Sequence, residues 1–353
     1  MMDVWLAFTL VFILSFGTAL ALVPLARWLS FRFKVLSVPG GRRAEKDPMP
    51  KLGSIALVGG FTVAAIASQM LPIPRYDAYE TIRFWGLLVG GALIFLLGVL
   101  DDVRELSYFP QAVGQMLVAA VAIFFQIFIE YFTNPFTGLP TPAWDYAVTV
   151  LLTLLWFGMM MNTVNFLDGI DGLAAGVVFI ACVMLFVHSA FILEPPQLSV
   201  SLLPLAMAGA CLGFLVYNFY PAKIYMGGGA LYLGFQLGAL SIIGGAKMAT
   251  VLLVIGLPLM DLAWQAFNRL RHRRNPFQGD RGHVHFRLLD SGLMTHRQIA
   301  LAYYAFCAFF GILAIMLDSQ LYKLMALIVM VLLIVVGFTV IARIKPLNYP
   351  PSS

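Results

Sequence analysis

The stretch Met1–Trp28 reads MMDVWLAFTLVFILSFGTALALVPLARW and carries charged side chains only at Asp3 and Arg27. A helix needs roughly 20 mostly apolar residues to cross a bilayer, so this stretch is long enough to span one. It lacks the basic start of a signal peptide and is longer and more uniform than one, which predicts a retained span. A second stretch, Met248–Met260, contains no charged residue, and similar runs recur along the chain.

The composition excludes a soluble globular protein. Hydrophobic residues make up 61% of the 353 positions and charged residues only 11%, whereas soluble domains carry about 25% charged residues. Windows of about 20 residues predict about eleven helices. No internal repeat, low-complexity tract or separate soluble domain interrupts them, so we expect residues 1–353 to form one all-α integral membrane domain. The expected spans are Val4–Leu25, Ser54–Leu71, Phe84–Leu100, Gln111–Phe132, Ala147–Met161, Leu173–Leu193, Leu202–Tyr217, Leu231–Ile243, Ala249–Trp264, Gln298–Leu317 and Tyr322–Ala342.

The basic residues gather on one side of these spans. Of the 22 Lys and Arg residues, only Arg75, Arg83, Lys247 and Lys323 fall on the other side. Because cytosolic loops carry the excess of Lys and Arg, the basic side is predicted to be cytosolic. The N-terminus is then expected outside and the C-terminus in the cytosol. The expected cytosolic loops lie near residues 29–53, 101–110, 162–172, 218–230 and 265–297.

Five aspartates lie near the predicted cytosolic ends of the spans. The positive-inside rule concerns Lys and Arg and does not account for them. Asp101 and Asp102 end the third span, Asp168 and Asp171 follow the fifth, and Asp261 lies in the ninth. Ionisable groups near hydrocarbon are costly and are therefore functional candidates. Two adjacent carboxylates repel each other unless a cation or basic group lies close. The alternative for Asp101 and Asp102 is a helix-end pair that simply faces water.

A polar row runs through residues 162–173, NTVNFLDGIDGL. Asn162, Asn165 and Asp168 recur every three residues, which puts them on one helical face, and Asp171 continues the row. Their oxygens suit Mg²⁺, which prefers one or two carboxylates together with substrate phosphate oxygens and water. A structural polar stripe between helices is the alternative, and four such residues in ten make it the weaker one.

Two further segments carry groups that bind phosphate. The stretch Asn218–Gly234 contains glycines whose N–H groups could face a phosphate at a helix start, although glycines also serve helix packing in membranes. The stretch DRGHVHFRLL, residues 280–289, combines His283 and His285 with basic residues. It could bind a diphosphate, or the His-x-His could be incidental. Zinc is disfavoured because no third strong ligand accompanies the two histidines.

The ordered set of motifs resembles the polyprenyl-phosphate N-acetylhexosamine-1-phosphate transferases, glycosyltransferase family 4. The matched elements cover nearly the whole chain: Arg42–Gly53, Asp101-Asp102, Asn162–Leu173, Asn218–Gly234, Asp261 and His283–Leu289. The His-x-His-x-Arg-Leu-Leu form is more similar to the branch that starts O-antigen, teichoic-acid and related envelope glycans than to the phospho-muramoyl-pentapeptide branch. The resemblance implies ten or eleven helices in the cell (inner) membrane and a cytosolic active site.

The resemblance also implies the reaction and the partners. The reaction is Mg²⁺-dependent transfer of a sugar 1-phosphate from a UDP-sugar to undecaprenyl phosphate, with release of UMP. Mn²⁺ is the alternative metal, a homodimer is an open alternative to a monomer, and no nucleic acid is expected. Metal and basic groups must neutralise the anions that meet in such a step.

Residue roles follow by position in the motifs. The resemblance implies catalytic roles for Asp101, Asp102, Asp168 and Asp171, with Asp102, Asp168 and Asp171 as metal ligands. The implied substrate-binding residues are Arg42, Arg43, Asn162, Asn165, Asn218, Lys223, His283, His285 and Arg287.

The chain departs from the family pattern at several positions. Where relatives read Met-Gly-Asp, this chain reads Met226-Gly-Gly-Gly-Ala230, so an aspartate that binds magnesium in the family is missing. A one-residue deletion fits best, and replacement by Gly228 is the alternative. A third histidine is Phe286, a histidine of the first basic loop is Glu45, and a lysine common at the start of the fourth helix is Gln111.

Three functions are therefore compared. The leading hypothesis is the sugar-1-phosphate transferase. The second is a catalytically weak or inactive relative that binds lipid phosphate or a partner enzyme, which the missing aspartate motivates. The third is a transporter, which would need ionisable residues through the bilayer centre. The outer halves of the spans are nearly free of charge, with Glu130 the main exception, so a transporter is the least favoured.

Overall fold

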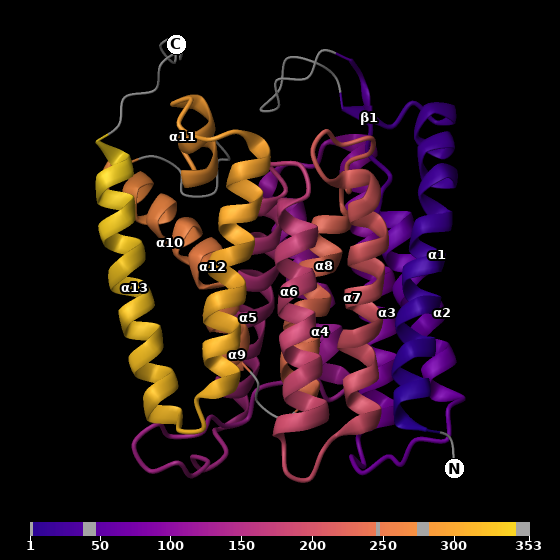
Figure 1. The fold of residues 1–353 in the computed structure, drawn as a ribbon, viewed down its shortest axis with the longest axis vertical. Helices are drawn as coiled ribbons and strands as arrows, with labels where there is room; N and C mark the ends of the chain where they lie inside the picture. The colour runs from indigo at the N-terminus through magenta and orange to yellow at the C-terminus, as the bar shows by residue number, and fades with distance from the viewer. Residues whose placement is uncertain (1–2, 38–46, 245–247, 274–281, 344–353) are drawn as a thin grey trace.

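The computed structural model describes residues 3–37, 47–244, 248–273 and 282–343, and this part of the chain is almost entirely helical. The helices form one bundle that extends from α12 and α13 on one side to α1 and α2 on the other (Figure 1). The single sheet in the described residues is an antiparallel pair of two-residue strands. The elements are α1 (Val4–Arg32), β1 (Leu36–Ser37), β2 (Met49–Pro50), α2 (Ser54–Gln69), α3 (Glu80–Arg104), α4 (Tyr108–Phe124), α5 (Tyr146–Leu167), α6 (Leu173–Val187), the π-helix η1 (His188–Ile192), α7 (Leu198–Asn218), α8 (Gly229–Ile243), α9 (Met248–Val254), α10 (Gly256–Arg271), α11 (Val284–Asp290), α12 (His296–Met316) and α13 (Gln320–Ala342).

The helices match the prediction of an all-α, multi-pass membrane protein. Within the described residues, seven helices are long and apolar enough to cross a bilayer, and the bent pair α9 and α10 would make an eighth. Three shorter apolar helices, α2, α4 and α8, fall below that length. The count of eleven spans and the orientation of the termini stay predictions. The start of α1 and the end of α13 lie at opposite ends of the bundle, and β1 and α11 lie at the α13 end (Figure 1).

Helix α8 forms the centre of the bundle, and it is mostly apolar, with Gln236 and Ser241 as its buried polar residues. Every residue from Gly229 to Ile243 is buried. Glycines let its neighbours approach closely: an added Cβ at Gly234 would lie 2.5 Å from the Cα of Met161 in α5. In the same way, a Cβ at Gly90 of α3 would lie 2.3 Å from the Phe235 ring. Small residues at such crossings are the usual means of helix packing in membranes.

Two predicted spans differ from the helices of the structure, one in where it ends and one in a bend. The fourth was expected to reach Phe132, but α4 ends at Phe124, and Gln126 has a φ of 63° that no helix continues through. The ninth was expected to be continuous, but the chain breaks at Ile255 and α10 departs from α9 at 75°. Pro258 is tolerated only because it lies in the first turn of α10. Run length could not reveal either break, since a mostly apolar window tolerates single polar residues such as Gln126, Glu130 and Asp261.

The predicted loops were too wide, because helices continue past the apolar zone into polar residues. In the predicted loop 29–53, α1 continues to Arg32, and β1 pairs with β2 in the described part. In loop 101–110, α3 runs to Arg104 and α4 begins at Tyr108. In loop 162–172, α5 runs to Leu167, and loop 265–297 contains the end of α10, all of α11 and the start of α12. Loop 218–230 is nearly as predicted.

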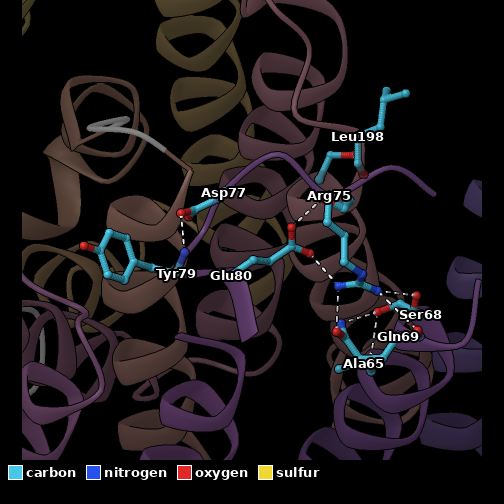
Figure 2. Close-up of polar contacts among 10 residues, drawn as sticks. Ala65, Ser68, Gln69, Arg75, Asp77, Tyr79, Glu80 and Leu198 are labelled. Carbon is cyan, nitrogen blue, oxygen red and sulfur yellow. Dashed lines mark hydrogen bonds and ion pairs between the residues drawn. The ribbon is translucent and has the colours of Figure 1, made fainter. Parts of the chain in front are cut away.

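A buried ion pair fastens the end of the bundle where α1 starts. Glu80 is 3% exposed, and its Oε1 accepts a hydrogen bond from Arg75 Nη1 at 2.6 Å (Figure 2). Its Oε2 accepts from the Ser199 hydroxyl at 2.8 Å. Arg75 Nη1 also donates to Gln69 Oε1 at 2.7 Å. One carboxylate thus joins the end of α2, the start of α3 and the start of α7.

We predict that Glu80→Gln lowers the stability of the protein in detergent by about 2 kcal/mol, because charge-assisted hydrogen bonds of a buried group are lost. The matched control is Asp77→Asn, which breaks the more exposed pair of Asp77 with Arg83 (2.8 Å). An exposed pair contributes about 0–1 kcal/mol. Thermal melting of both variants checks the difference, and equal melting temperatures would contradict the role of the Glu80 clamp.

Candidate active site

Asp102 lies near the end of α3, where it meets a cation and a backbone donor. Its Oδ1 lies 3.4 Å from Lys51 Nζ, and its Oδ2 accepts the Gly228 N–H at 2.8 Å. The Asp102 side chain is 4% exposed and that of Lys51 25%. The basic group that an adjacent carboxylate pair requires is therefore present, and it is Lys51, which the motif analysis did not single out.

Backbone pairing brings Lys51 to this position. Tyr225 N–H donates to Pro50 C=O at 2.8 Å, and the N–H groups of Gly53 and Ser54 donate to the carbonyls of Tyr225 and Met226 at 3.0 and 3.1 Å. Residues 50–54 therefore lie along the segment that precedes α8, although about 170 residues separate them in sequence. Sequence proximity gives no signal for this contact.

Close glycine packing sets the position of the turn that faces Asp102. Gly227 has a φ of +55°, and a Cβ added there would lie 2.2 Å from Asp102 Oδ2. A Cβ added at Gly228 would lie 2.2 Å from the Cα of Gly98 in α3. The two backbones thus touch, which lets the Gly228 N–H reach the carboxylate. A side chain at Gly228 in place of hydrogen has no room here.

Asp101 turns the other way, toward the start of α4. Its Oδ1 accepts the Leu106 N–H at 3.0 Å, and its Oδ2 accepts from Gln111 Nε2 at 3.1 Å. Gln111 occupies the position where the family commonly has lysine, and it still supplies a donor to the carboxylate. The two adjacent aspartates thus have different partners: Asp101 contacts the start of α4, and Asp102 contacts Lys51 and the turn before α8.

A second glutamine of α4 extends this contact to the polar row. Gln115 lies one turn after Gln111 and is 1% exposed. Its Oε1 accepts from Asn162 Nδ2 at 2.9 Å, and the same amide donates to Gly158 C=O at 2.7 Å. Gln111 and Gln115 therefore connect Asp101 with the row on α5. Two amides four residues apart in an apolar helix lie on one face of it, and this spacing is the sequence signal for Gln111 and Gln115.

The polar row has the predicted helical spacing as far as the end of α5. Asn162 and Asn165 lie on α5 and Asp168 caps its C-terminus. All three, and Asp171 in the following turn, are half-buried. Asp171 Oδ2 accepts the Ala222 N–H at 2.9 Å, which fixes the turn to the segment that precedes α8. Asn162 and Asn165 thus lie on one face of α5, and Asp168 and Asp171 follow at the end of the helix.

Asn218 fastens the same turn from within. It is 1% exposed, its Oδ1 accepts the Gly172 N–H at 3.1 Å, and its Nδ2 donates to Ile224 C=O at 2.9 Å. Both ends of its amide thus serve protein contacts in this structure. Lys223, the other residue predicted here as a substrate ligand, is exposed.

The two motif histidines pack around Asp261. Asp261 on α10 is 3% exposed, and its Oδ2 lies 3.1 Å from His283 Nδ1 and 3.7 Å from His285 Nδ1. Its Oδ1 accepts the Val284 N–H at 3.1 Å, which fastens the start of α11. The imidazoles are 2% and 1% exposed. Their Nδ1 atoms face Asp261 and hold α11 against α10, and their role in holding a diphosphate stays a prediction.

The histidine motif lies against the end of the polar row. A Cβ at Gly169 would lie 2.5 Å from the Phe286 ring and 3.0 Å from His285 Nε2, so α11 packs directly beside Asp168. The ring of His283 lies 4.8 Å from that of Phe166. Phe286, which stands where the family has a third histidine, thus fills a packing position. Arg287 is half-buried at the edge of this contact, with its Nε donating to Gly282 C=O at 3.1 Å.

The structure connects several of the predicted residues. Asp101 is joined to Asn162 through Gln111 and Gln115 of α4, Asp171 contacts the segment before α8, and Gly169, between the two aspartates, packs against the histidine motif. Arg42 and Arg43 lie outside the described residues, so their predicted roles stay predictions.

The carboxylates of this region suit a magnesium ion only if substrate shares it. In the described residues, no three His, Cys, Asp or Glu side chains gather into a group that could hold a metal. Mg²⁺ needs one or two carboxylates when phosphate oxygens and water complete its shell. Asp168 and Asp171, half-buried at the end of α5, fit this donor set. Asp102 could bind the ion only after its carboxylate lost its contact with the Lys51 ammonium or the Gly228 N–H.

Known proteins match this chain over the part that carries these residues. The family model for glycosyl transferase family 4 matches residues 84–245, which include both Asp101-Asp102 and the polar row. A probable undecaprenyl-phosphate N-acetylglucosaminyl 1-phosphate transferase from Bacillus subtilis is 30% identical over 331 residues, which cover 92% of this chain and 88% of the relative.

Two more relatives show the breadth of the likeness. A decaprenyl-phosphate N-acetylglucosaminephosphotransferase from Mycolicibacterium smegmatis is 32% identical over 78% of this chain and 74% of its own length. A phospho-N-acetylmuramoyl-pentapeptide-transferase from Pelotomaculum thermopropionicum is 28% identical over 88% of this chain and 96% of its own length. The resemblance drawn from the motifs is confirmed, and the chain belongs to glycosyl transferase family 4.

Proposed function

We propose that the protein transfers an N-acetylhexosamine 1-phosphate from a UDP-sugar to undecaprenyl or another polyprenyl phosphate and releases UMP, as the first membrane step of a cell-envelope glycan. The observation that carries this proposal is the polar row of α5, whose carboxylates lie at one end of an apolar bundle beside the histidine motif. The lipid acceptor stays in the membrane and the nucleotide stays in water, so the reaction needs a site at their boundary.

In the proposed step, an oxygen of the lipid phosphate attacks the sugar-bearing phosphorus of the UDP-sugar. A new phosphorus–oxygen bond forms, the bridging bond of the diphosphate breaks, and UMP leaves with its electron pair. Such a step depends mainly on positioning and on neutralising negative charge. Lys51 is the described cation nearest to the proposed acceptor site, because it lies 3.4 Å from Asp102.

The residues of the row would divide the work. Asp101 and Asp102 would position the acceptor phosphate through the donors that they orient, and Asn165 would donate a hydrogen bond to the donor substrate. Asn162 would accept one through its Oδ1, because its Nδ2 already donates to Gln115 and Gly158. Asp168 and Asp171 would hold Mg²⁺, or Mn²⁺ in its place, and the ion would neutralise the diphosphate. Asn218 would support these groups by packing, because both ends of its amide are engaged in protein contacts. His283 and His285, held by Asp261 through their Nδ1 atoms, would bind the diphosphate together with Arg287.

The proposal includes the membrane orientation. β1 and α11 lie at the end of the bundle where α13 ends (Figure 1). Lys51 directly follows the strand that pairs with β1, and Arg287 lies on α11, so both belong to this end. Under the positive-inside rule this end faces the cytosol of the cell membrane, with the N-terminus outside and the C-terminus in the cytosol. UDP-sugars are cytosolic, so the same orientation gives the site access to its donor. The oligomeric state, including a homodimer, stays a prediction.

The first test is release of UMP by the purified full-length protein. With Mg²⁺, a polyprenyl phosphate and a panel of UDP-N-acetylhexosamines, we expect UMP to form with at least one sugar, because the site combines acceptor and donor groups. The readout is UMP measured by chromatography. If no UDP-sugar yields UMP while an active relative does so in the same vesicles, the transferase proposal is wrong and the catalytically inactive alternative takes its place.

The second test concerns Gln111. We expect Gln111→Glu to lower turnover at least about tenfold near pH 7, because a carboxylate beside Asp101 Oδ2 replaces a donor by a like charge. The loss should diminish as the pH falls, since protonation of the new carboxyl restores a donor. Gln111→Lys is the matched control and should keep activity, because its ammonium also donates. A pH–rate profile of Gln111→Glu parallel to that of the unchanged protein would contradict this role.

The third test concerns the turn that lacks the family aspartate. We expect Gly228→Ala to lower the yield of folded, monodisperse protein severely, since its Cβ meets the Gly98 backbone at 2.2 Å. Gly229→Ala is the matched control and should lower the yield less, because its Cβ would lie 3.1 Å from the Ser54 Cα, a tight contact that a small shift relieves. Size-exclusion chromatography gives the comparison. Equal yields would remove the argument that Gly228 cannot simply be replaced by aspartate.

A further inference from the structure

A cavity of about 450 Å³ lies away from the polar row. Residues of α5, α9 and α13 line it, together with the segment that follows α4. Since α4 starts beside Asp101 and α13 begins at Gln320, this cavity lies toward the end of the bundle opposite the site. Its volume is in the range of ligand pockets, roughly 300–1,000 Å³.

The cavity is apolar and opens to the outside of the bundle. Trp144 and Trp156 contribute aromatic walls, and aliphatic side chains of all three helices complete them. Two of its lining residues, Leu155 and Phe132, are 59% and 47% exposed. Because α5 and α13 are both long and apolar enough to cross a bilayer, the mouth of the cavity faces lipid. An acyl chain suits such a groove.

One cation lies within this apolar lining. Lys323, in the first turn of α13, lines the cavity and is 7% exposed. Asp318 acts on it electrostatically, but among the described residues no carboxylate lies within the 4.0 Å of an ion pair and no hydrogen-bond acceptor meets its ammonium. An ammonium in an apolar site is costly unless an anion compensates it. The cavity therefore combines an apolar lining with an ammonium that has no ion-pair partner among the described residues.

We propose that this cavity binds an anionic phospholipid of the surrounding membrane, with an acyl chain along α5 and α9 and the phosphate at Lys323. The charge complementarity decides between occupants: a neutral lipid or an apolar helix of a partner would fill the groove and leave the ammonium without an anion. This binding does not depend on the proposed transferase activity, because the cavity and the polar row are made by different residues.

The test measures retained lipid by native mass spectrometry. The full chain is reconstituted with equal amounts of phosphatidylglycerol and phosphatidylcholine, without nucleotide sugar, and then extracted into mild detergent. We expect the unchanged protein to retain phosphatidylglycerol in preference. Lys323→Gln should lower that retention about fivefold, the effect of about one membrane-surface lysine, and Lys323→Arg should keep it.

Two matched controls separate the cavity from its surroundings. Arg343→Gln removes one charge from the opposite, exposed end of the same helix and should leave retention unchanged. Leu155→Trp fills the mouth of the cavity and should reduce retention, whereas Leu151→Trp, equally exposed one turn away and outside the lining, should not. Both leucines face outward, so folding is expected to be intact in each variant.

Three results would overturn the proposal. Lys323→Gln that retains phosphatidylglycerol as before would remove the role of the charge. Arg343→Gln that loses as much as Lys323→Gln would reduce the effect to diffuse surface attraction. Preferential retention of a polyprenyl phosphate, offered at equal concentration, would identify a different occupant. Because no UDP-sugar is present, each result is independent of UMP release.

Discussion

The Asp102 carboxylate is shared between the Lys51 ammonium and the Gly228 N–H, and the rest of the candidate site depends on this arrangement. It joins three parts of the chain: the end of α3, the strand pair before α2, and the turn that starts α8. A buried carboxylate that loses its partners is strongly destabilising. The contact is possible only because Gly98 and Gly228 carry no side chain, so backbone packing and electrostatics are satisfied together.

The fold class and the family could be predicted from sequence because their signals are local. Apolar run length indicates a membrane helix, and the spacing of Asn162, Asn165 and Asp168 places them on one helical face, as found. The break at Ile255 and the early end of α4 could not be predicted, because both occur within apolar sequence. Apolar composition reports the environment of a segment and gives no information on where its axis turns.

The partners of the site residues were less predictable than the residues themselves. Asp101, Asp102 and Asp261 stood out because charge is rare in this chain, but Lys51 and Gln115 did not, and Gln111 was noted only as a departure from the family lysine. Lys51 belonged to a loop whose basic residues the positive-inside rule already explained, and glutamine in a membrane helix carries no charge. The histidines were predicted to be ligands. Their burial against Asp261 follows from the bend between α9 and α10, which sets the direction of α10 and of Asp261 on it.

The missing Met-Gly-Asp carboxylate can be understood from the same contact. The position that a Cβ at Gly227 would take lies 2.2 Å from Asp102 Oδ2, so a carboxylate already faces this turn, but it comes from α3. Lys51 neutralises it, which makes it a weaker metal ligand than a free aspartate. In the proposed reaction, the negative charge that holds a diphosphate-bound cation would then come mainly from Asp168 and Asp171. These lie at the end of α5, where the Ala222 N–H engages one oxygen of Asp171 and the donor substrate would supply the remaining ligands.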